Sequence, residues 1–326
     1  MGYNLAFLAT PTFGGWITMT AHLSLKYNYP LFKISKSGRN EKNTRPFGYG
    51  VKYQNISIDD LLKKENILIT ALDKHFHKYL DMFPDSTTIV MHDPNDFKSE
   101  PVQQFLKRVN VITIREAVKQ NLLINHNIES EFKYHPFHEY DRKTYGNNTS
   151  DKCISINRID FDKNTHIILK ANPLIKDDCN KIWIYGKENR LYVQFTLIKM
   201  GLKDEFMKYW RGRFAKTLPI SIEDKDILNN AKYVVDLSVI KGDGGGTQYT
   251  FLEAIHQDCI LILHKDWVEK GNLFKDKVNC YVVGYTDNVE QELADIINNE
   301  NTHEVLDETI LNNSKEIMIN NTTVVW

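Results

Sequence analysis

A glycine-rich segment in the second half of the chain joins a predicted strand to a predicted helix. The apolar run Tyr233–Leu237 predicts the strand, residues Thr247–Gln257 predict the helix, and Gly244–Gly246 stand directly before it. Glycines let a backbone approach a ligand closely and take positive φ angles. A helix start adds unbonded N–H groups and a partial positive charge, which together suit a phosphate. The segment therefore predicts a phosphate site; the alternative is a flexible loop, since the Lys-Ser/Thr ending of a P-loop is absent.

Glu253 lies one turn beyond Tyr249 in the same predicted helix. A carboxylate at that place can accept hydrogen bonds from two neighbouring hydroxyls, as a ribose or a sugar presents them. An ordinary surface glutamate is the alternative interpretation. The ligand-binding residues predicted in this segment are Gly245, Gly246, Thr247, Gln248, Tyr249, Thr250 and Glu253.

Two cationic residues follow the apolar run Cys153–Ile156, which predicts another strand. Arg158 comes just after that run, and Lys163 lies within reach of the next predicted helix start. Arginine can bind phosphate oxygens through two parallel hydrogen bonds, and lysine adds a point charge. Together they could neutralise a diphosphate; the alternative is a solvated loop with salt bridges to Asp160 and Asp162.

Polar residues also follow two predicted strands of the first half. His92 and Asp93 come directly after Thr87–Met91, and Gly14 and Gly15 follow Leu5–Ala9. In parallel sheets, ligands bind beyond the carboxyl ends of the strands, so both places are candidates for chemistry. The alternatives are an Asx-turn made by Asp93 and a plain turn at the two glycines.

The elements that must position these residues alternate regularly along the chain. The predicted strands are Leu5–Ala9, Ile67–Thr70, Thr87–Met91, Val109–Ile114, Cys153–Ile156, Lys181–Tyr185, Tyr233–Leu237, Cys259–His264 and Cys280–Val283. The predicted helices are Trp16–Tyr27, Arg115–Asn125, Thr247–Gln257, Val289–Asn298 and one that begins near Thr165. Strand-then-helix alternation predicts mostly parallel sheets covered by helices.

The polar stretch 141–152 divides this alternation into two series. We therefore expect two Rossmann-like α/β domains, residues 1–145 and 146–326, that face each other across a cleft. The Asn-rich stretch 311–322 is expected to be irregular.

Composition limits the classes of function. The 326 residues are 42% hydrophobic with a formal net charge of −1, which is globular and argues against a protein whose main task is to bind DNA. It does not exclude an enzyme that acts on DNA. No apolar stretch reaches the roughly 18 residues that span a bilayer. The start lacks the basic lead of a secretory signal, and the four cysteines form no CxxC pair. We expect a cytoplasmic protein with reduced thiols, no membrane contact and no metal site.

Arg158, Lys163 and Leu252–Glu253–Ala254 together resemble the retaining glycosyltransferases of the GT-B type. Those enzymes carry an Arg and a Lys after the first strand of their second domain, and a Gly-rich loop that leads into a helix with Leu-Glu-Ala. They often have a second glutamate eight residues earlier, where this chain has Gly245, and Asp243 is the nearby carboxylate that would compensate. The resemblance implies an acceptor domain followed by a nucleotide-sugar domain. It also implies a hexosyl- or pentosyltransferase with a UDP-sugar such as UDP-glucose as co-substrate, and no tightly bound cofactor or metal.

Within that group, the chain is more closely similar to the DNA α-glucosyltransferases of T-even phages. The similar patches are His92–Asp93, Ile156–Asn157–Arg158, Tyr185–Gly186, Tyr249–Thr250 and Leu252–Glu253. The resemblance implies that Gly186, Gly14 and Gly15 contact the donor. It implies that His92 or Asp93 contacts the sugar or the acceptor hydroxyl, where a carboxylate could take a proton or stabilise positive charge at the anomeric carbon. The leaving phosphate is the alternative base.

The sequence indicates the acceptor less specifically than it indicates the donor. The stretch 208–216 interleaves basic and aromatic residues, including Trp210, Arg211 and Arg213, and can hold phosphates and stack a base. The alternative is a helix end with a solvated basic face. Lys36 and Arg39 lie in a basic loop of the first domain. Three hypotheses stay open: sugar transfer to a hydroxymethylated pyrimidine flipped out of phage or viral double-stranded DNA, transfer to a surface glycan, and a non-catalytic nucleotide-sugar-binding protein.

Overall fold

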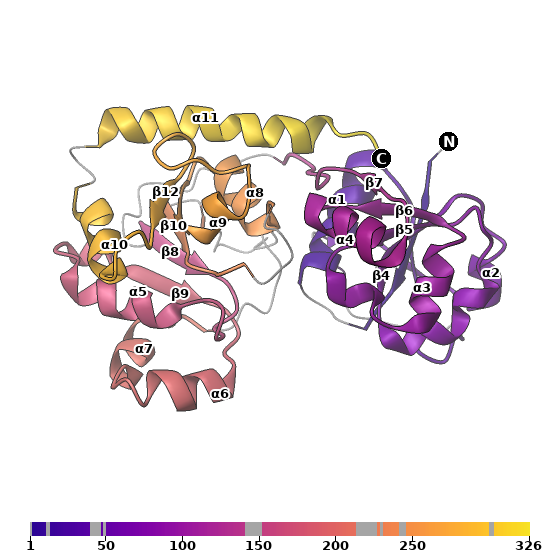
Figure 1. Ribbon diagram of the computed structural model, residues 1–326, viewed down its shortest axis with the longest axis horizontal. Helices are drawn as coiled ribbons and strands as arrows, with labels where there is room; N and C mark the ends of the chain where they lie inside the picture. The colour runs from indigo at the N-terminus through magenta and orange to yellow at the C-terminus, as the bar shows by residue number, and fades with distance from the viewer. Residues whose placement is uncertain are drawn as a thin grey trace. The chain divides into compact units, whose positions relative to one another are not determined.

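The computed structural model describes residues 2–10, 14–39, 47, 50–140, 152–212, 227–228, 231–240, 246–299 and 303–326 (Figure 1). The chain forms two compact units. Unit 1 holds the described residues up to 139 together with 320–326, and unit 2 holds the described residues from 140 to 319. The predicted division at 145/146 falls within 141–151, outside the described residues.

Unit 1 is built on a parallel sheet with the strand order β3-β2-β1-β4-β5-β6-β7. The strands are β1 (Asn4–Leu8), β2 (Leu31–Lys33), β3 (Gln54–Asn55), β4 (Ile67–Leu72), β5 (Thr88–Met91), β6 (Asn110–Thr113) and β7 (Glu131–Phe132). The helices are α1 (Gly15–Tyr27), α2 (Ile58–Leu61), α3 (Glu100–Leu106) and α4 (Glu116–His126), with 3-10 helices at Lys74–Met82 and Pro94–Phe97. All six residues of β4 are buried, as expected for a central strand covered on both faces. The direction of strand order reverses between β1 and β4.

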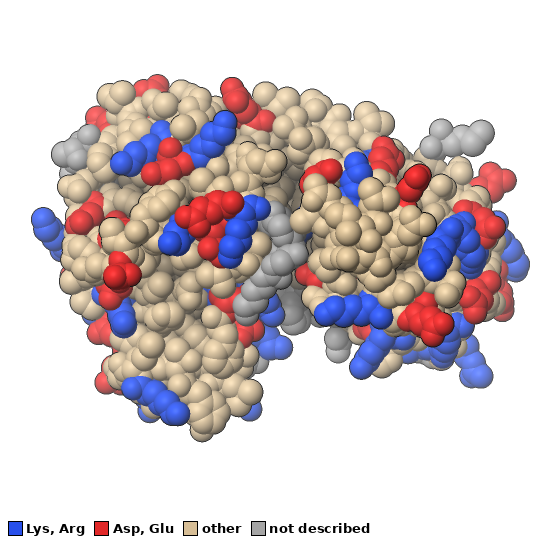
Figure 2. Space-filling view, in the orientation of Figure 1, with Lys and Arg blue, Asp and Glu red and all other residues tan. Residues whose placement is uncertain are grey.

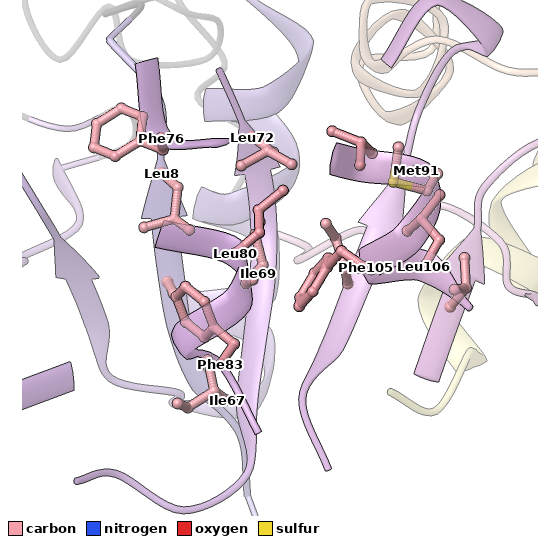
Figure 3. Packing of buried hydrophobic residues seen from close by; sticks show 14 of the residues in the cluster. Leu8, Ile67, Ile69, Leu72, Phe76, Leu80, Phe83, Met91, Phe105 and Leu106 are labelled. Atoms are coloured by element: carbon pink, nitrogen blue, oxygen red, sulfur yellow. The ribbon is translucent and has the colours of Figure 1, made fainter. Parts of the chain in front are cut away.

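The core of unit 1 forms where the sheet packs against the 3-10 helix Lys74–Met82 and α3. Ile67 and Ile69 alternate along β4 and so share one face of the sheet. Figure 3 shows the buried side chains of this cluster, among them Leu8, Ile67, Ile69, Leu72, Phe76, Leu80, Phe83, Met91, Phe105 and Leu106. The rings of Phe83 and Phe105 meet edge to face at 6.1 Å between centroids. This packing fixes the strands whose carboxyl ends carry the predicted site residues.

Unit 2 is built on a second parallel sheet, with the order β12-β11-β10-β8-β9. Its strands are β8 (Cys153–Ile156), β9 (Ile182–Tyr185), β10 (Tyr233–Asp236), β11 (Ile260–His264) and β12 (Tyr281–Val283). Its main helices are α5 (Thr165–Ala171), α6 (Arg190–Tyr192), α7 (Lys203–Tyr209), α8 (Tyr249–His256), α9 (Asp266–Glu269), α10 (Val289–Asn298) and α11 (Glu304–Thr323). Here the strand order reverses between β8 and β10, which makes that junction the expected place for a ligand.

The expectation of an irregular stretch at 311–322 is wrong, because α11 continues unbroken to Thr323 (Figure 1). Asp307 anchors the helix on the sheet by accepting hydrogen bonds from Tyr233 Oη at 3.0 Å and Tyr281 Oη at 2.7 Å. Lys232 adds an ion pair to Asp307 at 2.8 Å. Ile310 and Ile317 are buried. Tertiary packing of one face therefore outweighs the modest helix propensity of asparagine.

Residues 320–326, which comprise the last turn of α11 and the residues after it, pack within unit 1. Lys26 Nζ donates to the Asn321 carbonyl at 3.0 Å, and Phe137 N donates to the same carbonyl at 2.9 Å. Tyr29 Oη donates to the Trp326 carbonyl at 2.9 Å. Segments from both ends of the chain thus complete this unit.

The rest of the described chain carries few special features. No helix within it is long and apolar enough to cross a membrane. All four cysteines are free, with Cys179 exposed and the others buried. No group of three or more His, Cys, Asp or Glu side chains in the described ranges could hold a metal ion. On the face shown in Figure 2, basic side chains lie among acidic ones.

Candidate functional site

The loops that follow β8 and β10 are bonded to each other where the strand order of unit 2 reverses. Asn164 Nδ2 donates to the Leu237 carbonyl at 3.0 Å, from a left-handed backbone conformation with φ 49° that asparagine tolerates. Lys163 Nζ donates to Ser238 Oγ at 2.9 Å. The sheet order thus brings the predicted Lys163 to the start of the glycine-rich segment.

Asp236 and Ser238 hold the Lys163 ammonium in place. Only 13% of the Lys163 side chain is exposed, and Ser238 is buried. Ser238 donates from its backbone N to Asp236 Oδ1 at 2.8 Å and from its hydroxyl to the same oxygen, so its lone pairs are left for Lys163. The other carboxylate oxygen of Asp236 is buried without a hydrogen-bond partner among the described residues. These hydrogen bonds from Ser238 to Asp236 and from Lys163 to Ser238 were not predicted from the sequence.

Arg158 stays largely in solvent at the same strand end. Its side chain is 68% exposed and makes ion pairs with Asp160 at 3.6 Å and Asp162 at 3.9 Å. These are the salt bridges of the alternative interpretation. Ion pairs of this length and exposure contribute about 0–1 kcal/mol, so the guanidinium can turn toward an anion at little cost.

Gly186 occupies a position that has no room for a Cβ atom. Its φ is 151°, and a Cβ built on it would lie 1.6 Å from the carbonyl oxygen of Asn157. The Gly186 carbonyl accepts a hydrogen bond from Trp210 Nε1 at 3.0 Å. Gly186 therefore packs directly against the residue before Arg158, and its close approach shapes that loop.

The predicted phosphate-binding helix begins at Tyr249 as α8. Gln248 precedes it without a side-chain hydrogen bond to the helix, and Gly246 has a positive φ of 99°. Thr247 and Tyr249 are buried, whereas Gly246, Gln248 and Thr250 are half-buried. Gly245 lies outside the described residues. The helix start therefore has the glycine conformation that the sequence predicted, with no side-chain cap on its first turn.

The segment 266–271, which contains α9, lies beside both described ends of the glycine-rich segment. Ile240 N donates to Asp266 Oδ2 at 3.1 Å, and Lys270 Nζ donates to the Ile240 carbonyl at 3.3 Å. A Cβ on Gly271 would lie 3.9 Å from the backbone nitrogen of Gly246. Hydrogen bonds thus fix the Ile240 end, and the Gly246 end lies next to the same segment.

Glu253 lies deeper than the sequence suggested. Only 1% of its surface is exposed, and its carboxylate accepts a hydrogen bond from the Tyr140 hydroxyl. Tyr140 was not singled out in the sequence, because it stands 113 residues away and outside any motif.

In unit 1, His92 and Asp93 are bound into the end of β5. His92 Nε2 lies 2.9 Å from the Thr70 carbonyl, and the backbone N–H groups of His92 and Asp93 both donate to Asp96 Oδ2 at 3.1 Å. Asp93 Oδ1 accepts from Asn95 N at 2.8 Å and caps the 3-10 helix Pro94–Phe97. The Asx-turn interpretation of Asp93 is confirmed, and its role in chemistry stays a prediction. The role of Asp96 in holding the backbone of His92 and Asp93 was not predicted from the sequence.

Burial sets the protonation of this cluster. Burial lowers the pKa of His92 to about 4, although the hydrogen bond to the Thr70 carbonyl acts in the other direction. Burial raises the pKa of Asp96 to about 6. At neutral pH, His92 is therefore uncharged. Because a carbonyl only accepts, Nε2 carries the proton and Nδ1 keeps a lone pair that can accept from a hydroxyl.

The predicted glycine pair lies at the start of α1. Gly14 has a φ of 112°, and nothing within 4 Å would meet a Cβ on Gly15. The next residue, Trp16, places its ring 6.2 Å from the His92 ring. Unit 1 thus brings the Gly14–Gly15 turn and His92 into one neighbourhood.

The predicted acceptor residues fall in both units. Trp210 stacks on Phe206 at 5.2 Å between ring centroids, and the Arg211 guanidinium lies 3.5 Å from the Trp183 ring centroid, both within unit 2. Trp210 therefore takes part in local packing.

In unit 1, Lys36 and Arg39 have exposed side chains on a turn in which Gly38 N donates to the Ser35 carbonyl. Arg213 lies outside the described residues.

Solved structures show which fold this arrangement belongs to. No protein-family model and no curated protein matches the sequence. The Anabaena protein HepE in complex with UDP matches with a TM-score of 0.65 and 14% identity over 98% of this chain and 97% of that one. The α-glucosyltransferase of phage T4, in complex with UDP and a 13-mer DNA containing an HMU base, matches with a TM-score of 0.69 and 13% identity over 99% and 96%.

This chain has the GT-B fold. A glycosyltransferase from Rickettsia africae shares it, with a TM-score of 0.63 and 14% identity over 98% of this chain and 94% of that one. The predicted pair of Rossmann-like α/β domains and the resemblance to GT-B glycosyltransferases are therefore confirmed. Similarity at this level of identity establishes the GT-B fold, and the activity has to be argued from the site.

Proposed function

We propose that this chain is a glycosyltransferase that moves a sugar from a UDP-sugar to a hydroxyl acceptor, with the diphosphate held in unit 2. The observation that carries the proposal is the Lys163 ammonium, fixed 2.9 Å from Ser238 at the reversal of strand order. Arg158 and the glycine-rich entry to α8 belong to the same strand ends. The solved HepE and α-glucosyltransferase structures both contain UDP, which supports the choice of nucleotide.

In this reaction, the bond between the anomeric carbon and the diphosphate oxygen breaks as a bond to the acceptor oxygen forms. Negative charge then develops on the leaving UDP. Lys163 and Arg158 would stabilise that charge, and such preorganised electrostatic contacts are a large part of enzymatic rate enhancement. The resemblance at Arg158, Lys163 and Leu252–Glu253–Ala254 supports retention of configuration at the anomeric carbon.

Unit 1 would supply the contacts to the acceptor. The Nδ1 lone pair of neutral His92 can accept from the acceptor hydroxyl, because the Thr70 carbonyl fixes the other ring nitrogen. The proton of the acceptor then goes to the leaving phosphate or to the His92–Asp93 pair.

We propose a hydroxymethylated pyrimidine in DNA as the acceptor. The patches shared with the DNA α-glucosyltransferases support it, as does the modified DNA in the similar T4 structure. The exposed Lys36, Arg39 and Arg211 could contact phosphates. A surface glycan is the second candidate, since a HepE structure of the same fold holds UDP and glucose.

The donor site is tested by thermal unfolding with nucleoside diphosphates. UDP should raise the melting temperature by mass action. Arg158→Ala and Glu253→Ala should each lose UDP binding and remain folded, whereas Arg108→Ala in unit 1 should retain it. No shift with any nucleoside diphosphate at millimolar concentration, or unchanged affinity in both site variants, would contradict the donor site.

The acceptor is tested with UDP-sugars and DNA that contains hydroxymethylcytosine. After digestion, mass spectrometry should detect nucleosides heavier by one sugar residue. If DNA gains no mass while a glycan acceptor is modified, the second candidate replaces the first. Transfer to neither acceptor, with UDP bound, would favour the non-catalytic hypothesis.

A further inference from the structure

The carboxylate of Glu253 is closed off by a tyrosine from outside the helices and strands of unit 2. Tyr140, the first residue of that unit, donates its hydroxyl to Glu253 Oε2. Gln257 Nε2 donates to the Tyr140 hydroxyl at 3.3 Å, and His256 Nε2 donates to the Tyr140 carbonyl at 2.9 Å. The rings of Tyr140 and His256 meet at 4.4 Å between centroids. The end of α8 thus holds Tyr140 by both its hydroxyl and its carbonyl.

This arrangement matters because a ligand hydroxyl needs the position that Tyr140 fills. Glu253 is only 1% exposed, so its carboxylate must keep hydrogen-bond donors, since an unpaired buried charge is costly. A phenol and a sugar hydroxyl offer the same kind of O–H donor. One can therefore replace the other at Glu253 without leaving the carboxylate unpaired.

We infer that Tyr140 occupies the place at Glu253 that a ribose hydroxyl of the nucleotide takes, and that it withdraws when a ribonucleotide binds. The inference rests on the proposed donor site and adds a residue that sets its specificity. A nucleotide without ribose hydroxyls cannot replace the Tyr140 donor, so it gains nothing by displacing it. The apparent affinity for every ribonucleotide is then the intrinsic affinity multiplied by the fraction of molecules in which Tyr140 has left Glu253.

The test compares UDP with 2′,3′-dideoxy-UDP, by calorimetric titration of the full chain. Tyr140→Phe removes the competing hydroxyl and should tighten UDP binding roughly tenfold, the size expected for a hydrogen bond to a charged group. Dideoxy-UDP should bind the variant and the wild type alike, so the ratio of the two affinities should rise by the same factor. Gln257→Ala, which removes the contact to the Tyr140 hydroxyl, should change the ratio in the same direction by about twofold to threefold.

Tyr281→Phe is the matched control, because it also removes a hydroxyl that donates to a buried carboxylate, Asp307, in unit 2. It should lower the melting temperature and leave both nucleotide affinities unchanged. A Tyr140 that only ties the chain to α8 would behave like this control, and an unchanged ratio in Tyr140→Phe would overturn the inference.

A gain in affinity that is equal for UDP and dideoxy-UDP would also overturn it. If Tyr140→Phe does not fold, Gln257→Ala decides by the same ratio. Failure of the wild type to bind either nucleotide would contradict the proposed function itself. Binding of UDP by the wild type with no change of ratio in the variants would contradict this inference alone.

Discussion

Units 1 and 2 share an architecture but place different chemistry at their strand ends. Each has a parallel sheet whose order reverses near its centre. Unit 2 gathers cations there, with Lys163 held by Ser238 and Arg158 exposed beside it. Unit 1 gathers His92, neutral at pH 7, and the carboxyl groups of Asp93 and Asp96. One set suits a diphosphate and the other suits a hydroxyl, so the loops decide what each copy of the fold can do.

The largest expected difference between the units is the loss in free energy of unfolding when a glycine at a strand end is replaced by alanine. Gly186→Ala should lower the free energy of unfolding by about 2–4 kcal/mol, because the methyl group would meet the Asn157 carbonyl at a positive φ. Gly15→Ala in unit 1 has open space and should change it by less than about 0.5 kcal/mol. Urea unfolding measures both. Equal effects would show that the backbone approach in unit 2 is not as close as described.

Substitutions at the strand ends of the two units should have different effects on the affinity for UDP. Lys163→Met should weaken UDP binding about 10- to 100-fold, because a charge-assisted contact to phosphate is lost. His92→Gln should leave UDP affinity within about twofold. Lys170→Met serves as the control, since Lys170 is partly exposed and pairs with Glu290 at 3.9 Å. If His92→Gln weakens UDP as much as Lys163→Met does, the division between the units is wrong.

The dependence of stability on pH should test the protonation states of His92 and Asp96 in unit 1. The pKa of His92 is lowered from 6.5 to about 4, so its contribution to stability is present above pH 6.5 and lost as the pH falls toward 4. The pKa of Asp96 is raised from 3.8 to about 6, so its contribution is present below about pH 4 and lost as the pH rises through 6. The two trends oppose each other in the wild type.

Removing one of these two groups should therefore leave the pH dependence of stability that the other contributes. Compared with the wild type, His92→Gln should lose about 1–2 kcal/mol of stability as the pH rises from 4 to 6.5, and Asp96→Asn should gain a similar amount. Urea unfolding at several pH values gives the slopes. Slopes of the same sign in both variants would contradict the assigned protonation states.

The smallest effect concerns Trp210, which was predicted to bind the acceptor. Trp210→Phe removes the hydrogen bond to the Gly186 carbonyl and should lower the stability of unit 2 by about 1 kcal/mol. Its effect on transfer to DNA should not exceed that of Phe206→Leu, which disturbs the same stack. A selective loss of DNA modification in Trp210→Phe would support the predicted acceptor role.

The sequence allowed most of the fold to be predicted. Every predicted strand is present within two residues of its expected bounds, because the central strands are long apolar runs. Strand β2, which lies between β1 and the edge strand β3, has only three residues and ends at Lys33. The Lys33 ammonium lies over the rings of Phe7, Phe47 and Tyr53. Such a strand gives no apolar pattern to recognise.

Site residues could be predicted only where the pattern that indicates them lies within one continuous segment of the sequence. Arg158, Lys163 and the start of α8 each follow a strand in their own segment. The contacts of Ser238 with Lys163, and of Tyr140 with Glu253, join residues 75 and 113 positions apart. Such contacts depend on the order of strands in the sheet, which alternation along the chain does not determine.

Hydrogen exchange with and without UDP tests the central claim most directly. We predict slower exchange of backbone amides at 157–164, 236–240 and 246–252 of unit 2, and unchanged exchange at 92–97 of unit 1. Unchanged exchange throughout unit 2 at saturating UDP, or slowing confined to unit 1, would contradict the assignment of the diphosphate to the strand ends that carry Arg158 and Lys163.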